Sequence, residues 1–370
     1  MAKANTFFFV SNAQDGDISV FQLDADAPHL EPVARVPAEE MVMPLAVHPQ
    51  LPLLFAAVRK APFSILTYHI DRATGALLQV ERTPVKHSLV NLRFDRTGRW
   101  LLGASYGANT LTAFGLDESG RLDPTPSFAF TSGQKPHDIV VADSHDVVFV
   151  PHLGDDLIHA YHFDEKKGRL SLDPLYALSF PKGTGPRHGA LSKDGKFLYV
   201  LGELRGTVHV FERSSLDSSF SILQRETSIP SGVRLRPGSA RPPSGVKLDD
   251  PVSHEDTIYC ADIHLSPDGR FLYTSERTRG LITCFSIDPT SGRISQTQTI
   301  LSVSSPRSFA IDPTGRFVVV AGQTSEHVAL YSVDSANGEL NLVSQATGGK
   351  DANWVATCRF ELPSESAISS

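Results

Sequence analysis

Residues 264–287 read HLSPDGRFLYTSERTRGLITCFSI, and two other segments repeat the same pattern. They are LSKDGKFLYVLGELRGTVHVFE (191–212) and IDPTGRFVVVAGQTSEHVALYSV (311–333). In each segment a turn containing Asp-Gly or Thr-Gly separates two runs rich in β-branched and aromatic residues, and a second loop leads to a third run. Each copy therefore predicts three consecutive β-strands.

Three further segments carry a weaker form of the pattern and extend it over most of the chain. They are VHPQLPLLFAAVRKAPFSILTYHI (47–70), FDRTGRWLLGASYGANTLTAFGL (94–116) and DSHDVVFVPHLGDDLIHAYHF (143–163). The first apolar residue after each turn aligns the six copies at Leu53, Trp100, Val147, Phe197, Phe271 and Phe317. Successive aligned residues are 47, 47, 50, 74 and 46 positions apart. A period in the forties with several short strands per unit is typical of β-propeller blades.

A seventh unit is divided between the two ends of the chain. The run FFFVSNA (7–13) has the pattern of a second strand with no first strand before it, and NWVATCRFE (353–361) has that of a first strand with nothing after it. Pairing the two would complete one blade and remove the open edges of the ring. We predict an all-β, seven-bladed β-propeller closed by pairing N- and C-terminal strands in one blade. The propeller would be a single domain over residues 1–361, followed by a C-terminal tail at 362–370.

The composition argues against several classes of protein. No apolar run approaches the roughly 20 residues needed to cross a bilayer, and the first residues, MAKANTFFFVSNAQ, lack the long apolar core of a signal peptide. A formal net charge of −7 argues against nucleic-acid binding. The cysteines form no CxxC pair, so we expect buried thiols in a reducing compartment. We therefore expect a cytoplasmic protein with no membrane or nucleic-acid partner, and a monomer, the default for a closed propeller.

Unlike polar residues occupy equivalent positions of the repeat. Ten residues before the aligned apolar residue, at the start of the strand that would line the central channel, three of five copies are basic where strand propensity favours Val or Ile. These residues are Arg187, Arg307 and His137. The next position holds His188 and Asp262, with His264 two residues beyond Asp262 on the same strand face. Six residues after the aligned residue, at the end of the second strand, are Glu203, Arg277, Gln323, Tyr106 and Arg59.

Two interpretations of this polar set are open. The carboxylates could neutralise the arginines as salt bridges between blades, which is a structural role. Alternatively, the excess of positive charge predicts a small anionic ligand, because a planar guanidinium forms paired, charge-assisted bonds with phosphate or carboxylate. We favour the second interpretation, since structural positions of a repeat, such as its Asp-Gly turns, keep the same residue types.

Three segments carry a resemblance to a known family: GPRHGALSKDGKFLYVLGEL (185–204), ADIHLSPDGRFLYTSERT (261–278) and PRSFAIDPTGRFVVVAGQ (306–323). They resemble the propeller-type lactonases, a seven-bladed family best known for bacterial 6-phosphogluconolactonases of the pentose phosphate pathway. The likeness extends from Phe7 to about Phe360. It implies hydrolysis of an anionic sugar lactone, first of all 6-phosphogluconolactone to 6-phosphogluconate, without a cofactor.

The chain departs from this family in two places. Many relatives carry a second histidine close after the one that matches His137, where this chain has Asp138. Residues 213–258 form a long insertion, rich in Pro, Gly and Arg, in which no strand pattern is evident. The insertion is either a surface loop or a lid that adds Arg234, Arg236, Arg241 or Lys247 to the pocket.

Hydrolysis of a lactone needs an aligned water, a base and stabilisation of the carbonyl oxyanion. We expect Glu203 to be the base, with His188 as the alternative, and Arg187, His188 and His264 to surround the carbonyl as catalytic residues. The expected substrate-binding residues are Arg59, Arg277 and Arg307 as anion clamps, with Tyr106, His137, Asp262 and Gln323. We expect no metal, because an arginine-rich pocket repels a divalent cation and no calcium-binding loop is evident. Unrelated calcium-dependent sugar lactonases are nevertheless also propellers.

Two other functions remain open. The same groups could let a substrate hydroxyl attack the carbonyl in place of water, which would make the protein a lactone isomerase. The family is also similar to fungal carboxymuconate cyclases, and a pocket that excludes water would favour this class. A non-catalytic interaction propeller would instead show an internally salt-bridged ring and an exposed apolar patch. The lactone hydrolase is the preferred hypothesis.

Overall fold

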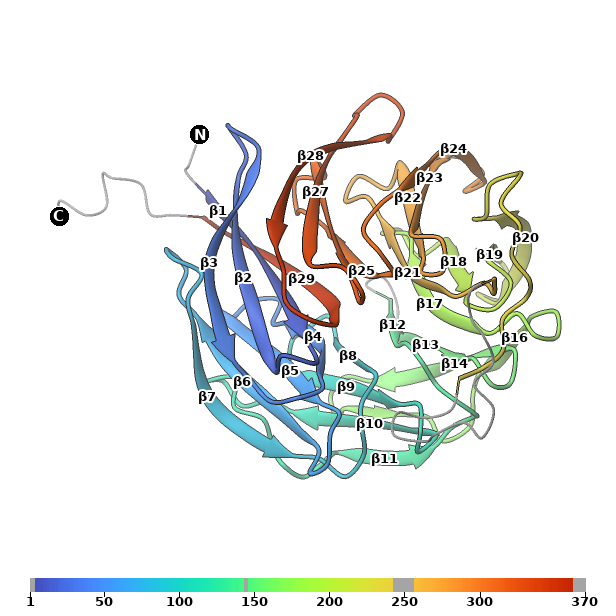
Figure 1. Ribbon diagram of the computed structural model, residues 1–370. Coiled ribbons are helices and arrows are strands. Elements are labelled where there is room, and N and C mark those ends of the chain that lie inside the picture. The colour runs from blue at the N-terminus through green and yellow to red at the C-terminus, as the bar shows by residue number, and fades with distance from the viewer. Residues whose placement is uncertain (1–3, 143–145, 242–255, 362–370) are drawn as a thin grey trace.

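The computed structural model describes residues 4–142, 146–241 and 256–361. Over these residues the chain forms seven antiparallel sheets that follow one another around a central channel (Figure 1). The innermost strands of neighbouring sheets contact one another all the way around. We number the sheets as blades 1 to 7, and we give the strands of each blade from the channel outward.

The seven blades have the following strands. Blade 1 contains β29 (Ala352–Glu361), β1 (Ala4–Asn12), β2 (Asp17–Asp24) and β3 (His29–Pro37); blade 2 contains β4 (Val42–Val47), β5 (Leu53–Val58), β6 (Ser64–Ile70) and β7 (Leu77–Pro84). Blade 3 contains β8 (Asn91–Phe94), β9 (Trp100–Ser105), β10 (Thr110–Gly115) and β11 (Phe128–Thr131); blade 4 contains β12 (Val140–Val141), β13 (Val147–His152), β14 (Leu157–Asp164), β15 (Arg169–Leu170) and β16 (Tyr176–Ser179). Blade 5 contains β17 (Pro186–Leu191), β18 (Phe197–Gly202), β19 (Thr207–Arg213) and β20 (Phe220–Thr227). Blade 6 contains β21 (Cys260–Leu265), β22 (Phe271–Glu276), β23 (Leu281–Ile287) and β24 (Ile294–Leu301); blade 7 contains β25 (Pro306–Ile311), β26 (Phe317–Gly322), β27 (His327–Val333) and β28 (Leu340–Thr347).

The last strand of the chain closes the ring. β29 pairs antiparallel with β1, from Ala4 opposite Glu361 to Asn12 opposite Ala352. Figure 1 shows red β29 beside the blue strands β1 to β3. The prediction of a seven-bladed propeller with one blade shared between the two chain ends is therefore confirmed.

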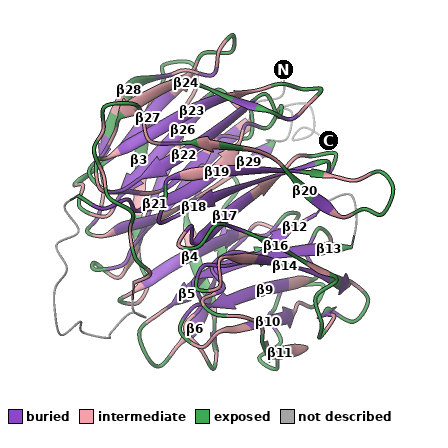
Figure 2. Cartoon of the chain, turned by 90° about the vertical axis from the view of Figure 1, so that its right-hand side faces the viewer, coloured by how far each residue is buried: buried purple, intermediate pink, exposed green. Residues whose placement is uncertain are grey.

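Apolar side chains fill the spaces between neighbouring blades. The middle strands β5 and β26 are buried along their whole length because other blades cover both of their faces. Between blades 1 and 2, for example, Phe7 and Phe9 belong to one cluster with Leu54 and Tyr68. In Figure 2 the buried residues fill the inner and middle strands, whereas exposed residues lie mainly in turns and outer strands.

The turn between the first and second strands is closed by the same side-chain hydrogen bond in four blades. The residue before the turn accepts a hydrogen bond from the backbone N–H of the aligned apolar residue. The donor and acceptor pairs are Trp100–Asp95, Phe197–Ser192, Phe271–Ser266 and Phe317–Asp312, with distances of 2.9, 2.9, 3.0 and 2.7 Å. We call this side of the propeller the turn end.

The blades also contain outer strands that the sequence patterns did not identify. β20 pairs with β19 and lies inside the range 213–258, which we expected to be an insertion without strands. That expectation is wrong for β20. Only Phe220 of its sequence FSILQRET is buried, so the strand lacks the regular apolar alternation that identifies a half-buried strand. The insertion therefore begins after Thr227.

The three cysteines are free thiols. Cys260, Cys284 and Cys358 are buried and form no disulfide, in agreement with the prediction of buried thiols. Within the described ranges, no helix is long and apolar enough to cross a membrane. The expected tail at 362–370 lies outside the described residues.

Candidate functional site

β-bulges displace two arginines from the regular pairing of the inner strands, at the end of the channel opposite the turns. In β17 the pairing with β18 shifts between Pro186 and His188, which leaves Arg187 without an opposite residue. β25 repeats this shift around Arg307. A bulge re-aims a side chain while the strand continues. We call this side of the propeller the arginine end.

The ends of the second strands lie at equivalent positions, as the alignment of the repeats predicts. In four blades the residue six positions after the aligned apolar residue donates its backbone N–H to the carbonyl group just before the inner strand. The donors are Arg59, Glu203, Arg277 and Gln323, with distances of 3.0, 2.8, 3.0 and 3.0 Å. Their side chains therefore start from one level of the ring.

Glu203 lies between two arginines, one from its own blade and one from blade 6. Its Oε1 accepts a hydrogen bond from Arg277 Nη2 at 2.7 Å, and its Oε2 lies 3.0 Å from Arg187 Nε. All three side chains are buried, and Arg187 is only 1% exposed. Burial raises the pKa of Glu203, but the charges of Arg277 and Arg187 outweigh this effect, so its pKa lies below the usual value. Glu203 is therefore an ionised carboxylate at neutral pH.

Positive charge exceeds negative charge around Glu203. Burial lowers the pKa of Arg307, and the charges of Arg187, Arg277 and Arg59 lower it further. Burial and the charge of Arg187 likewise lower the pKa of Arg59 to about 10. Burial is the largest cause of these shifts, and repulsion between the guanidinium groups adds to it. An anion bound among them would relieve this repulsion.

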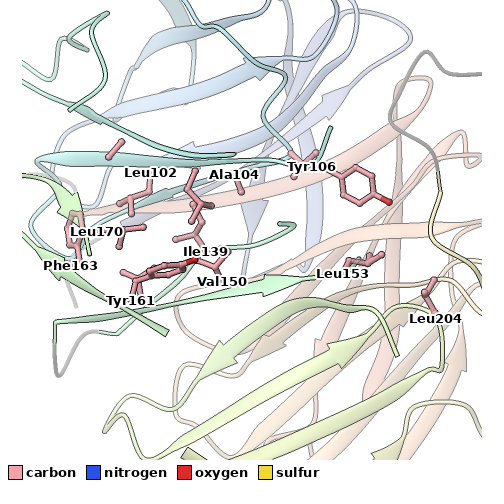
Figure 3. Packing of buried hydrophobic residues seen from close by; sticks show 14 of the residues in the cluster. Leu102, Ala104, Tyr106, Ile139, Val150, Leu153, Tyr161, Phe163, Leu170 and Leu204 are labelled. Atoms are coloured by element: carbon pink, nitrogen blue, oxygen red, sulfur yellow. The ribbon is translucent and has the colours of Figure 1, made fainter. Parts of the chain in front are cut away.

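Tyr106 and His137 contribute to the same end of the channel from blades 3 and 4. Their ring centroids are 5.7 Å apart, and the His137 and His188 centroids are 5.2 Å apart, both pairs edge to face. Burial and the charge of Arg187 hold the pKa of His137 well below its usual value, so this imidazole is neutral. Figure 3 shows the Tyr106 hydroxyl pointing away from the apolar layer to which Ile139 belongs.

His188 connects the arginine end with the central channel. Its Nε2 accepts a hydrogen bond from Arg187 Nη1 at 2.8 Å, and its Nδ1 donates one to Asp262 Oδ1 at 2.8 Å. Burial and the charge of Arg187 lower the pKa of His188, so its ring is neutral at pH 7. A carboxylate that holds one nitrogen of a neutral imidazole orients the ring so that the other nitrogen can accept a proton.

His264 lies on the channel side of Asp262 and not among the arginines. Its Nε2 is 3.2 Å from Asp262 Oδ2, and its side chain is 38% exposed. It lines a cavity of 620 Å³ that reaches Pro267 in the turn of blade 6. The lining of this cavity includes His188 and Asp262 but neither Arg187 nor Glu203. The layer of His188 and Asp262 thus separates the open channel from the arginine end.

Two aspartates join neighbouring blades through hydrogen bonds. The salt bridge between blades that the sequence analysis considered is instead the one between Glu203 and Arg277. Asp138 accepts a hydrogen bond from Asn91 of blade 3 at 2.9 Å and another from the backbone N–H of Gly189 of blade 5 at 2.9 Å. Asp262 accepts a hydrogen bond from Ser308 of blade 7 at 2.8 Å, in addition to its contact with His188. Asp262 therefore bridges two blades, and its role in substrate binding stays a prediction.

The other residues that the sequence analysis named for the site are Gln323 and the basic residues of the insertion. Gln323 donates a hydrogen bond to Asp351 Oδ1 at 3.0 Å. Of the four basic residues named for the insertion, Arg234 and Arg236 are exposed, Arg241 is partly buried, and Lys247 lies outside the described residues. Among the described residues, no group of three His, Cys, Asp or Glu side chains could hold a metal ion.

Tyr259 is a residue of this end that the sequence analysis did not identify. It precedes β21, it is 1% exposed, and its ring lies under the guanidinium groups of both Arg241 and Arg277. The only sequence signal was an aromatic residue immediately before the inner strand of a copy that begins after the insertion. In chemical terms, this end combines several arginines, one ionised carboxylate and two neutral imidazoles in a buried setting.

Known proteins similar to this chain are lactonases. Residues 7–357 match the family described as lactonase, 7-bladed beta-propeller. The 6-phosphogluconolactonase of Serratia proteamaculans is 32% identical, over 94% of this chain and 97% of the relative. That of Xenorhabdus nematophila is 31% identical, over 86% of this chain and 88% of the relative. The periplasmic gluconolactonase of Pseudomonas aeruginosa shares the fold, with a TM-score of 0.81 at 22% identity over 96% of this chain and 99% of that chain.

Proposed function

The chain belongs to the family of seven-bladed β-propeller lactonases, and we propose that it hydrolyses 6-phosphogluconolactone to 6-phosphogluconate at the arginine end. The observation that carries the proposal is the gathering of four arginines around the carboxylate of Glu203, namely Arg187, Arg241, Arg277 and Arg307, with Arg59 near Arg187. This excess of positive charge suits a substrate with an anionic group. The name shared by the two bacterial relatives supports the choice of lactone.

The arginines bind and orient the substrate. Their planar forks form parallel, charge-assisted hydrogen bonds with phosphate oxygens. Arg187 lies between Glu203 and His188, so a lactone carbonyl placed against Arg187 is within reach of both candidate bases. The same guanidinium stabilises the negative charge that develops on the carbonyl oxygen when water adds.

The reaction needs one proton acceptor that later becomes a donor. Water attacks the carbonyl carbon while the base removes its proton, which gives a tetrahedral oxyanion. The intermediate collapses, the bond from carbonyl carbon to ring oxygen breaks, and the ring oxygen takes the proton back from the base. The product is the open-chain acid, which loses its proton to solvent.

Glu203 is the proposed base. Its low pKa makes it a weak base while Arg277 and Arg187 hold it. An anionic substrate competes for these arginines, which weakens their effect and raises the pKa of Glu203 when the substrate is bound. His188 is the alternative base, because Asp262 holds the proton on Nδ1. Its Nε2 accepts a hydrogen bond from Arg187 Nη1, so it can take a proton only after the bound substrate has drawn Arg187 away from it. Comparing Glu203→Gln with His188→Gln separates the two roles.

Lactone isomerisation is the second candidate, and burial of the site favours it. Arg187 and Glu203 are 1% and 5% exposed, so a substrate hydroxyl could reach the carbonyl in place of water. The outcome depends on which nucleophile occupies the site when the substrate is bound.

NMR of freshly prepared 6-phosphoglucono-δ-lactone tests both candidates, because it resolves the open acid from the δ- and γ-lactones. The proposal predicts faster formation of 6-phosphogluconate with the wild-type protein, and loss of this acceleration in Arg307→Ala. Rapid exchange between δ- and γ-lactone without additional acid would instead establish the isomerase. No acceleration of either process would contradict both.

A further inference from the structure

Residues 228–241, the first of the two described parts of the insertion, lie against the arginine end, and we call them the covering segment. Arg236 forms a parallel β-bridge with Thr257, so the segment runs beside the chain that enters β21. The backbone N–H of Gly238 donates to the carbonyl of Leu204, one residue after Glu203, at 2.8 Å. The covering segment is thus fixed to the rim by backbone hydrogen bonds.

Two tyrosines of the arginine end hold the last residues of this segment. Tyr106 donates its hydroxyl hydrogen to the carbonyl of Arg241 at 2.7 Å, and Tyr259 donates to the carbonyl of Ser239 at 3.2 Å. Gly238 allows the close approach, because a Cβ at this position would overlap the carbonyl oxygen of Ile258. The placement of Arg241 is therefore determined by several contacts.

The side chain of Arg241 extends over the same aromatic ring as Arg277. The Arg241 Cζ lies 4.1 Å from the centroid of the Tyr259 ring, and the Arg277 Cζ lies 5.6 Å from it. Stacking on an aromatic face holds a guanidinium in place while its N–H groups stay directed to the side. The Nε of Arg241 is buried and has no hydrogen-bond partner among the described residues.

The charge of Arg241 interacts with the charged groups of the arginine end. Burial and the charge of Arg277 lower the pKa of Arg241, whereas Glu203 acts in the opposite direction. Arg241 in turn contributes to the low pKa of Glu203, after Arg277 and Arg187. Glu203 is already bonded to Arg277 and Arg187, so among the described residues the charge of Arg241 has no carboxylate partner of its own.

We propose that Arg241 and Arg277, both over Tyr259, bind the phosphate group of the substrate and so determine preference for phosphorylated over unphosphorylated sugar lactones. This inference rests on the proposed function of the arginine end. A phosphate has three terminal oxygens and can accept parallel bonds from two guanidinium forks at once. A neutral hydroxyl at the same place would not neutralise the positive charges of these two arginines. The insertion thus supplies a specificity-determining residue that the repeat itself does not encode.

The test compares Arg241→Ala and wild type with two substrates, 6-phosphoglucono-δ-lactone and glucono-δ-lactone. For the phosphorylated lactone, the value of kcat/KM in Arg241→Ala is expected to fall ~10–100-fold, mainly through KM, because a hydrogen-bonded ion pair is lost. For the unphosphorylated lactone, kcat/KM is expected to stay unchanged. Arg241→Lys keeps the charge but loses the planar guanidinium and its stacking on Tyr259. Its kcat/KM for the phosphorylated lactone should therefore lie between those of wild type and Arg241→Ala.

Arg234→Ala is the matched control, since it removes an exposed arginine from the same segment. It should leave both substrates unaffected, and thermal unfolding of each variant checks that the fold is retained. Competitive inhibition by inorganic phosphate gives a second measurement, and it should weaken in Arg241→Ala but not in Arg234→Ala.

The outcomes separate this inference from the proposed function. A wild-type protein that accelerates hydrolysis of neither lactone contradicts the proposed function. A wild type that hydrolyses the phosphorylated lactone, with Arg241→Ala lowering the rates for both lactones equally or for neither, contradicts only the role of Arg241. A loss confined to lactones carrying a carboxylate in place of phosphate would assign Arg241 to a different anion and would also overturn the inference.

Discussion

The turn end and the arginine end are built from the same repeat, yet their polar residues are used in opposite ways. At the turn end, Ser192 and Ser266 occupy one repeat position and make the same hydrogen bond to the backbone of their own blade. At the arginine end, Glu203 and Arg277 also occupy one repeat position, but they carry opposite charges and bind each other across blades. At the turn end, these side chains complete hydrogen bonds within their own blade. At the arginine end, side chains from different blades contact one another.

The difference separates structural from functional positions within one molecule. Closing a turn requires one acceptor for one backbone N–H, so every blade can use a small oxygen-bearing side chain. Binding a ligand on the axis of a ring requires different groups from different directions. Repulsion among Arg59, Arg187 and Arg307 is a cost that the fold itself does not need. Substitutions at the two ends should therefore affect different properties.

The largest expected effect is on turnover in Glu203→Gln. Removing the base should lower kcat for 6-phosphoglucono-δ-lactone by ~10²–10⁴-fold, the usual contribution of a positioned general base. Ser192→Ala, at the turn end of the same blade, should leave kcat unchanged. Steady-state rates of both variants check the contrast.

A near-normal kcat in Glu203→Gln would exclude Glu203 as the base. His188→Gln is then the informative variant. If that substitution alone abolishes turnover, the carboxylate of Glu203 serves to position Arg187 and Arg277 instead.

A smaller effect is expected on the pH dependence of catalysis in Arg187→Gln. Burial and the charge of Arg187 lower the pKa of His188 below its ordinary value of 6.5. Removing the charge should raise this pKa, so the ring should become protonated at a higher pH than in wild type. An NMR titration of His188 measures the shift directly.

If His188 is the base, the acidic limb of the kcat/KM profile should move to higher pH by the same amount. An acidic limb that stays in place while the NMR titration shifts would separate His188 from the catalytic step. A titration that does not shift would contradict the electrostatic coupling between Arg187 and His188.

The smallest expected effect on catalysis is that of Asp312→Ala at the turn end, whose consequence should be a loss of stability. Asp312 is buried, and it accepts hydrogen bonds from the backbone N–H groups of Phe317 at 2.7 Å and Thr314 at 2.9 Å. Leaving the buried N–H group of Phe317 without a partner costs about 1–3 kcal/mol. Urea unfolding should show this decrease in the free energy of unfolding.

Enzyme activity below the unfolding transition should be unchanged in Asp312→Ala. A variant of normal stability and reduced activity would reverse the assignment of the two ends. Arg307→Ala, by contrast, should lose activity and keep or gain stability, because it removes one of several mutually repelling charges.

Both the fold and the meeting of residues at the ends of the second strands could be predicted from the sequence, because both depend on the repeat period. Counting from Phe197 and Phe271 brought Glu203 and Arg277 to one level, where the structure pairs them. β20 was missed because its outer position leaves a single residue buried. The repeat alone therefore predicts the inner part of each blade better than its rim.

Contacts that depend on local geometry could not be predicted. The bulge at Arg187 follows from how β17 pairs with β18, and a residue count does not contain this register. His264 was expected beside the carbonyl, but the structure shows it behind Asp262, on the wall of the channel. Tyr259 and Arg241 meet only because the covering segment folds back to the ring, which no pattern within the repeat indicates.

Calorimetric binding of 6-phosphogluconate to wild type, Arg307→Ala and Arg93→Ala shows whether the anionic ligand binds at the arginine end. Both variants remove one arginine beside the same channel, but Arg307 lies at the arginine end and Arg93 lines the cavity that reaches the turn end. If the ligand binds at the arginine end, Kd rises ~10–100-fold in Arg307→Ala and stays at the wild-type value in Arg93→Ala. Binding that survives in Arg307→Ala and is lost in Arg93→Ala would place the ligand in the open channel and contradict binding at the arginine end.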